Sequence, residues 1–101
     1  MATFYRAVSF AELADFRQTG TLRSRVGSCE GKHFALSIQD ANHWGESFYG
    51  SGRFALIQID IDDAVAATFM RWNRIDGIGP ACFATIDQLE GAKISEVMDE
   101  P

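Results

Sequence analysis

Alternation of apolar and polar residues over positions 54–61 predicts the clearest strand of this chain. Its apolar side chains recur at every second position, at Ala55, Ile57, Ile59 and Ile61. Gln58 and Asp60 stand between them, which is the period-two pattern of a strand with one apolar and one wetter face. Because isoleucine also favours strands, we expect this segment to lie centrally in a sheet and to contribute stability.

Three segments carry helix-start signals. The signals are the capping-box pairs Ser9/Glu12 and Ser37/Asp40 and the acidic pair Asp62/Asp63. Each is followed by apolar or aromatic residues at helical spacing, so the signals predict helices that run to about residue 19, over 38–44 and through residue 71. Gly20 and Gly45 are natural ends for the first two helices.

The remaining segments complete the order of elements. Further strands are predicted over residues 3–8, 33–36, 81–86 and 93–97, and loops over 21–30, 45–53 and 73–80. Strands and helices then alternate through most of the chain, an order that suits an α+β fold. The length of 101 residues suits one domain over residues 1–101, long enough for a single core.

Composition and charge narrow the class of protein. Apolar residues make up 47% of the chain, which argues against disorder, and no apolar run is long enough to span a bilayer. The N-terminus lacks a signal-peptide pattern, so we expect a soluble protein that acts in a cytosol. The net charge of −5 disfavours a nucleic-acid partner, because it repels phosphate backbones. Cys29 and Cys82 have no metal-ligand spacing and are expected to be reduced thiols, and no metal site is predicted.

An arginine lies on the apolar face of the first predicted strand. Alternation over residues 3–8 places Arg6 between Phe4 and Val8. Removing a guanidinium from water is costly unless an anion meets it. Either Arg6 extends its head to solvent from a strand edge, or it holds a phosphate or ribose of a bound nucleotide.

Four short motifs carry a resemblance to a known family. They are Tyr5-Arg6, Glu30-Gly-Lys-His-Phe-Ala35, Ala41-Asn-His-Trp-Gly45 and Asp76-Gly-Ile-Gly-Pro-Ala81. In this order they resemble the small ADP-ribosyltransferase-like C-terminal effector domains of bacterial polymorphic toxins, within the superfamily of poly-ADP-ribose polymerases and diphtheria toxin. The resemblance covers most of the chain. It implies a split, mostly antiparallel sheet with short flanking helices around an NAD cleft.

The resemblance also implies roles for individual residues. Arg6 would hold the pyrophosphate side of NAD, and Ser37 would orient the catalytic acid. Gly31, Lys32, His33, Phe34 and Trp44 would complete the NAD site, with His33 and Phe34 beside nicotinamide. The expected catalytic acid is Asp76, with Asp87 and Glu90 as the other candidates.

The chain departs from the family pattern at two places. Asp40 stands where a serine contacts the nicotinamide carboxamide, and no Glu-x-Glu or Gln-x-Glu pair precedes the last core strand. Structural readings also stay open: Ser37 as a helix cap, His33 as a hydrogen-bonding group, Trp44 as core and Asp76 as a turn residue.

The expected function is NAD-dependent mono-ADP-ribosyl transfer to a macromolecular target, with release of nicotinamide and with a cognate immunity protein as a partner. Two other functions are compatible with the sequence. One is a toxin ribonuclease that uses His33 and His43 as an acid–base pair. The other is a non-catalytic binding module on the same fold. The sequence does not identify the acceptor, or distinguish transfer from hydrolysis of NAD.

Overall fold

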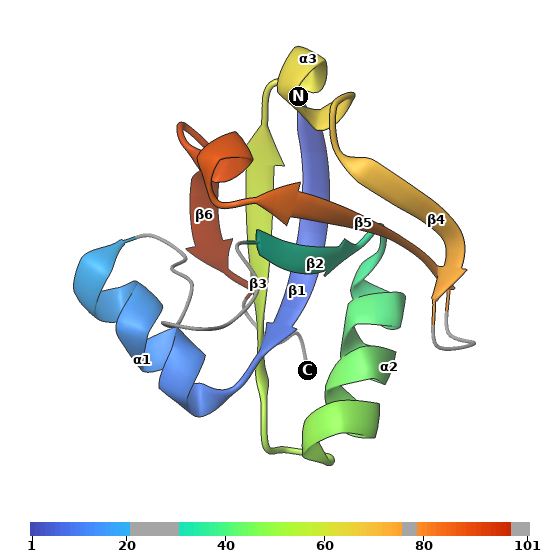
Figure 1. Ribbon diagram of the computed structural model, residues 1–101. Coiled ribbons are helices and arrows are strands. Elements are labelled where there is room, and N and C mark those ends of the chain that lie inside the picture. The colour runs from blue at the N-terminus through green and yellow to red at the C-terminus, as the bar shows by residue number, and fades with distance from the viewer. Residues whose placement is uncertain (21–30, 76–78, 98–101) are drawn as a thin grey trace.

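Six strands form one antiparallel sheet in the order β4-β5-β2-β1-β3-β6 (Figure 1). The computed structural model describes residues 1–20, 31–75 and 79–97, and for 72–75 the backbone alone. The elements are β1 (Ala2–Val8), α1 (Phe10–Thr19), β2 (Gly31–Ala35), α2 (Ile38–Tyr49), β3 (Ala55–Ile61), α3 (Asp63–Ala66), β4 (Met70–Ile75), β5 (Gly79–Thr85), the 3₁₀ turn η1 (Asp87–Leu89) and β6 (Lys93–Glu96). The expected α+β class is therefore confirmed.

The sheet divides into two three-stranded halves between β1 and β2. The described ladder between these strands consists of one pair, Tyr5 opposite Ala35. By contrast, β1 pairs with β3 along its whole length, from Ala2–Ile61 to Val8–Ala55. Figure 1 shows β1 and β3 running upright while β2 and β5 cross them. The two halves are therefore joined at one point and diverge from it.

The main core lies where the two halves face each other. It combines residues of both halves with the inner side of α1: Phe4, Val8, Leu13, Phe34, Ile57, Ile59, Ile61, Cys82 and Ala84, with others at its edges. The predicted apolar faces of 3–8 and 54–61 are confirmed, because Phe4, Val8, Ile57, Ile59 and Ile61 belong to this core and Ala55 packs against it. Burial raises the pKa of the Cys82 thiol to about 11, which keeps that thiol neutral.

A second, smaller cluster lies under α2. It consists of Ala35, Ala41, Trp44 and Ala81, with Tyr5 and Leu56 packed against it. Figure 1 shows α1 and α2 at the lower end of the sheet, α1 towards β6 and α2 below β4 and β5. Side chains alternate along β1, so Phe4 and Val8 meet the first cluster and Tyr5 meets the second.

The predicted end of α2 at Gly45 is wrong. The helix continues to Tyr49 and is followed by Gly50, which has a positive φ of 95°. Gly45 stays inside the helix because the ring of Phe54 packs directly on it, where any Cβ would collide with the ring. Here the glycine serves close packing and does not stop the helix.

The predicted helix through residue 71 is also wrong. Asp62 caps a single turn, α3, through its Oδ2, which accepts from the N–H of Ala64 at 3.2 Å. The chain then enters β4, in which Met70 pairs with Phe83 of β5. Phe69 is buried against Phe4, with ring centroids 5.6 Å apart. Pairing with β5 and this aromatic contact outweigh the helical spacing of the apolar residues.

The loop over 21–30, the thiol of Cys29 and the position of Asp76 lie outside the described residues. Over the ranges that are described, no helix is long and apolar enough to cross a membrane.

Candidate ligand site where β1 and β2 diverge

The guanidinium of Arg6 bridges β1, β2 and α1. Its Nε and Nη2 donate to the two carboxylate oxygens of Glu12 on α1, at 3.0 and 3.1 Å. Its Nη1 donates to the backbone carbonyl of His33 on β2, at 3.0 Å. The Arg6 side chain is 18% exposed, so it does not extend freely to solvent as one reading of the sequence proposed.

The split of the sheet explains why Arg6 can reach β2. Beyond the Tyr5–Ala35 pair the two strands diverge. The Arg6 guanidinium crosses between them and donates to the His33 carbonyl. We call Tyr5, Arg6, His33 and Ala35 the β1–β2 junction.

Glu12 is the residue of this site that the sequence did not reveal. Its N–H is bound by the Ser9 side chain at 3.1 Å, as the capping box predicts. Its carboxylate, however, turns to Arg6 in a two-pronged ion pair. Glu12 stands six residues after Arg6, and that spacing becomes a contact because the chain reverses from β1 into α1 at Ser9.

Lys32 adds a second cation to the same carboxylate. Its Nζ lies 3.7 Å from Glu12 Oε2, and its side chain is 14% exposed. Burial by itself raises the pKa of Glu12, but the hydrogen bonds and charge of Arg6, helped by Lys32, outweigh it and hold that pKa below 4.5. We call Arg6, Glu12 and Lys32 the charged cluster.

Arg6 keeps donor capacity within this cluster. A guanidinium carries five N–H groups, and three take part in the bonds to Glu12 and His33. Among the described contacts, one N–H on Nη1 and one on Nη2 therefore remain for another acceptor. A phosphate or carboxylate oxygen is the acceptor that such a charged donor binds best.

The other β2 residues of the predicted site divide between the two faces of the strand. The His33 ring is exposed and lies against Phe83 of β5, with ring centroids 4.9 Å apart. Phe34 is fully buried in the main core. Alternation thus places the rings of His33 and Phe34 on opposite faces of β2. Close packing explains the glycine at position 31, because a Cβ there would collide with the Ala84 carbonyl and the Phe83 ring.

Ser37 and Trp44 both have structural roles in α2. Ser37 caps the helix, and its Oγ accepts from the Asp40 N–H at 3.2 Å. Trp44 is 6% exposed and belongs to the cluster under α2. Its indole Nε1 is buried without an acceptor among the described residues. The capping and core readings of the sequence are therefore confirmed, and the ligand roles of both residues stay predictions.

The candidate acids are placed as follows. Asp76 lies outside the described residues. Asp87 and Glu90 are exposed at the end of β5 that lies beside Gly31, because Gly31 pairs with Thr85. The opposite end of β5 begins at Gly79, where the Asp40 carboxylate packs so closely that a Cβ would collide with it. Within the described ranges, no group of three or more His, Cys, Asp or Glu side chains is arranged to hold a metal ion.

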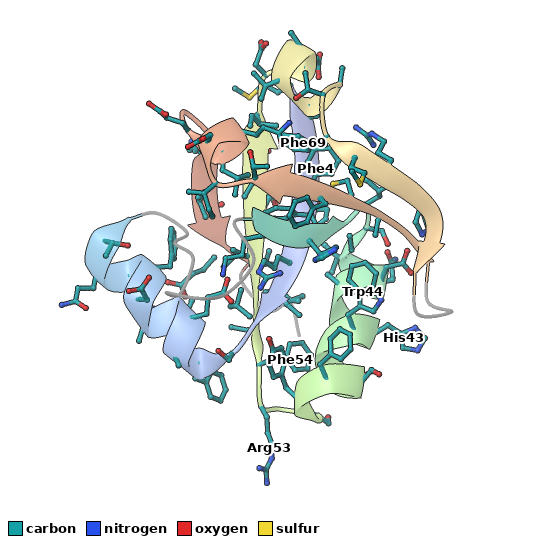
Figure 2. The ribbon with its side chains drawn as sticks, in the orientation of Figure 1. Phe4, His43, Trp44, Arg53, Phe54 and Phe69 are labelled. Carbon is teal, nitrogen blue, oxygen red and sulfur yellow. The ribbon has the colours of Figure 1, made fainter. Side chains whose placement is uncertain are left out.

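His33 and His43, the pair of the ribonuclease alternative, lie on different elements. His43 is exposed on α2, and Figure 2 shows its ring on the outer side of the helix, pointing away from the sheet. The His33 ring contacts Phe83 within the sheet. The geometry therefore offers no support for an acid–base pair made of these two rings.

Comparisons with known protein families, with curated proteins and with solved structures find no match for this chain.

Proposed function

We propose that this chain is an NAD-dependent mono-ADP-ribosyltransferase domain of a toxin, which binds NAD at the β1–β2 junction and has the split-sheet fold of that superfamily. The observation that carries the proposal is the placement of Arg6. Its guanidinium crosses from the first strand to the second and keeps two N–H groups for an anion. The motif resemblance implies that an arginine of the first strand holds the pyrophosphate side of NAD.

Burial supports a role for Arg6 in binding a ligand. A partly buried guanidinium loses little further freedom when it binds an oxyanion, because its ion pair with Glu12 already orients it. The Lys32 ammonium lies beside the same carboxylate. Two cations close together on an acidic chain suit the ionised phosphates of a dinucleotide.

The proposed reaction breaks the bond between nicotinamide and the ribose carbon of NAD. Nicotinamide leaves with the bonding electrons, and positive charge grows on the ribose as in glycoside cleavage. A nucleophilic hydroxyl or amine of the acceptor, or water, forms the new bond and loses its proton. A carboxylate beside the ribose stabilises the developing charge, and Asp76 is the residue proposed for it. The products are nicotinamide and either the ADP-ribosylated acceptor or free ADP-ribose.

The direct test is incubation of the purified protein with NAD labelled in its adenylate half and a bacterial lysate. Transfer of label to a macromolecule with release of nicotinamide supports the proposal. Release of nicotinamide with free ADP-ribose identifies hydrolysis instead. NAD binding without nicotinamide release identifies the non-catalytic binding module.

The role of Arg6 is tested by NAD titration calorimetry on Arg6→Ala. Loss of a charge-assisted contact to phosphate costs roughly 1.5–3 kcal/mol, so the dissociation constant should rise about ten- to a hundredfold. Arg17→Ala is the matched control, because Arg17 also forms a two-pronged pair with a glutamate but does so on the exposed side of α1. Unchanged NAD affinity in Arg6→Ala removes Arg6 from the site.

A further inference from the structure

One carboxylate oxygen serves both cations of the charged cluster. Glu12 Oε2 lies 3.0 Å from Arg6 Nε and 3.7 Å from Lys32 Nζ. Two positive groups repel each other, and in a half-buried place that repulsion is weakly screened. The carboxylate between them offsets that repulsion and draws an arginine from β1 and a lysine from β2 to the same oxygen.

The carboxylate also leaves the far side of Arg6 open to an oxyanion. Glu12 occupies the edge of the guanidinium made by Nε and Nη2. Nη1 is the corner of the planar group opposite that edge, and it retains an N–H beyond its bond to His33. An oxyanion at this corner is separated from the carboxylate by the guanidinium itself, which weakens the repulsion between the two anions.

We infer that Glu12 is a positioning residue of the ligand site, whose carboxylate holds Arg6 and Lys32 together as a two-cation cradle for the pyrophosphate of a dinucleotide. The inference rests on the proposed function, because that function supplies the ligand. Glu12 touches no ligand in this scheme and acts through the two cations. Loss of its charge lets the Arg6 and Lys32 side chains separate and lose their fixed orientation.

The test compares Glu12→Gln with Glu96→Gln, which makes the same change in the exposed pair of Arg17. Both are titrated by calorimetry with NAD and separately with inorganic pyrophosphate, at a temperature where circular dichroism shows each protein folded. We expect roughly five- to tenfold weaker binding in Glu12→Gln and unchanged binding in Glu96→Gln. Unchanged or tighter binding in Glu12→Gln overturns the inference.

A double variant separates positioning from a general loss of structure. If Glu12 acts through Arg6, adding Glu12→Gln to Arg6→Ala should weaken pyrophosphate binding less than Glu12→Gln does alone. Equal losses in the two backgrounds overturn the inference. If Glu12→Gln does not fold, Lys32→Gln serves instead, and unchanged pyrophosphate binding in that variant overturns the two-cation cradle.

The two probes keep this inference apart from the proposed function. Binding of pyrophosphate without binding of NAD by the unaltered protein removes the proposed function, and the same variants titrated with pyrophosphate still decide the role of Glu12. Binding of both with no effect of Glu12→Gln removes the inference and leaves the function. Binding of neither removes both.

Discussion

Two arginine–glutamate pairs in this protein have the same bonding and different surroundings. Arg6 and Glu12 form two N–H···O bonds of 3.0 and 3.1 Å, and Arg17 and Glu96 form two of 2.9 and 2.7 Å. The side chains of the first pair are both 18% exposed, whereas those of the second are 62% and 35% exposed. Bond length alone would rank the second pair higher. Burial reverses that order, because water and salt screen the exposed pair and leave the inner one strong.

The inner pair also has more neighbours that depend on it. Arg6 additionally serves a backbone carbonyl, and Glu12 additionally serves a lysine. The outer pair links α1 to the edge strand β6. We therefore expect the same substitution to lower stability more in the inner pair than in the outer pair, and four experiments test this difference.

The largest effect is expected from Glu12→Gln. Neutralising this carboxylate leaves Arg6 and Lys32 partly buried without their shared anion, and we expect the free energy of unfolding to fall by about 1.5–3 kcal/mol. Urea denaturation measures it. Glu96→Gln should cause a much smaller loss, and equal losses in the two variants would show that burial does not distinguish the pairs.

A smaller loss is expected from Arg6→Lys, about 1–2 kcal/mol. Lysine keeps the charge but cannot bond both Glu12 oxygens and the His33 carbonyl in one fixed geometry. Arg17→Lys, also followed by urea denaturation, is the control and should leave stability nearly unchanged. A loss in the control as large as in Arg6→Lys would contradict the comparison.

The third effect in size should be a pH-dependent contribution of the Glu12 carboxylate to stability. Its pKa is lower in the folded state than its ordinary value of 4.5, so its contribution is complete above that value and is lost as the pH falls through the folded pKa. The stability gap between the unaltered protein and Glu12→Gln should therefore narrow on acidification from pH 6 to about pH 3. Asp60 and Glu96 also have lowered pKa values, but their contributions are common to both proteins. A gap that stays constant with pH would rule out this account of Glu12.

The smallest expected effect is that of salt. Raising the ionic strength from about 0.05 to 0.5 M shortens the range of charge interactions between exposed groups. The small stability difference between the unaltered protein and Glu96→Gln should shrink, while the difference for Glu12→Gln should change little. Thermal denaturation at both salt concentrations is a sufficient measurement, and a larger salt response in Glu12→Gln would overturn the assignment of the inner pair.

Several parts of the fold follow from local pattern. Period-two alternation correctly assigned the inward faces of residues 3–8 and 54–61, and Ser9 and Ser37 cap the helices that they were expected to cap. These predictions succeed because a strand face or a helix cap depends on neighbours within a few residues. The helix through residue 71 failed because Met70 pairs with a strand that begins nine residues later, at Gly79.

The candidate site likewise combines a feature that local pattern predicts with one that depends on distant residues. The sequence indicated that Arg6 shares a strand face with Phe4 and Val8 and needs an anion there, because a guanidinium on an apolar face is costly without one. It did not indicate which anion, because the capping box with Ser9 already explained why a glutamate stands at position 12.

By itself the sequence determined that Arg6 shares a face of the first strand with Phe4 and Val8 and that Glu12 lies in the first turn of the following helix, because backbone alternation and capping are local. The tertiary structure alone decided that Arg6, Glu12 and Lys32 meet, since they lie on β1, α1 and β2 and come together only where the sheet divides after the Tyr5–Ala35 pair. That division is set by the packing of the two sheet halves around one shared core, to which residues far apart in the chain all contribute.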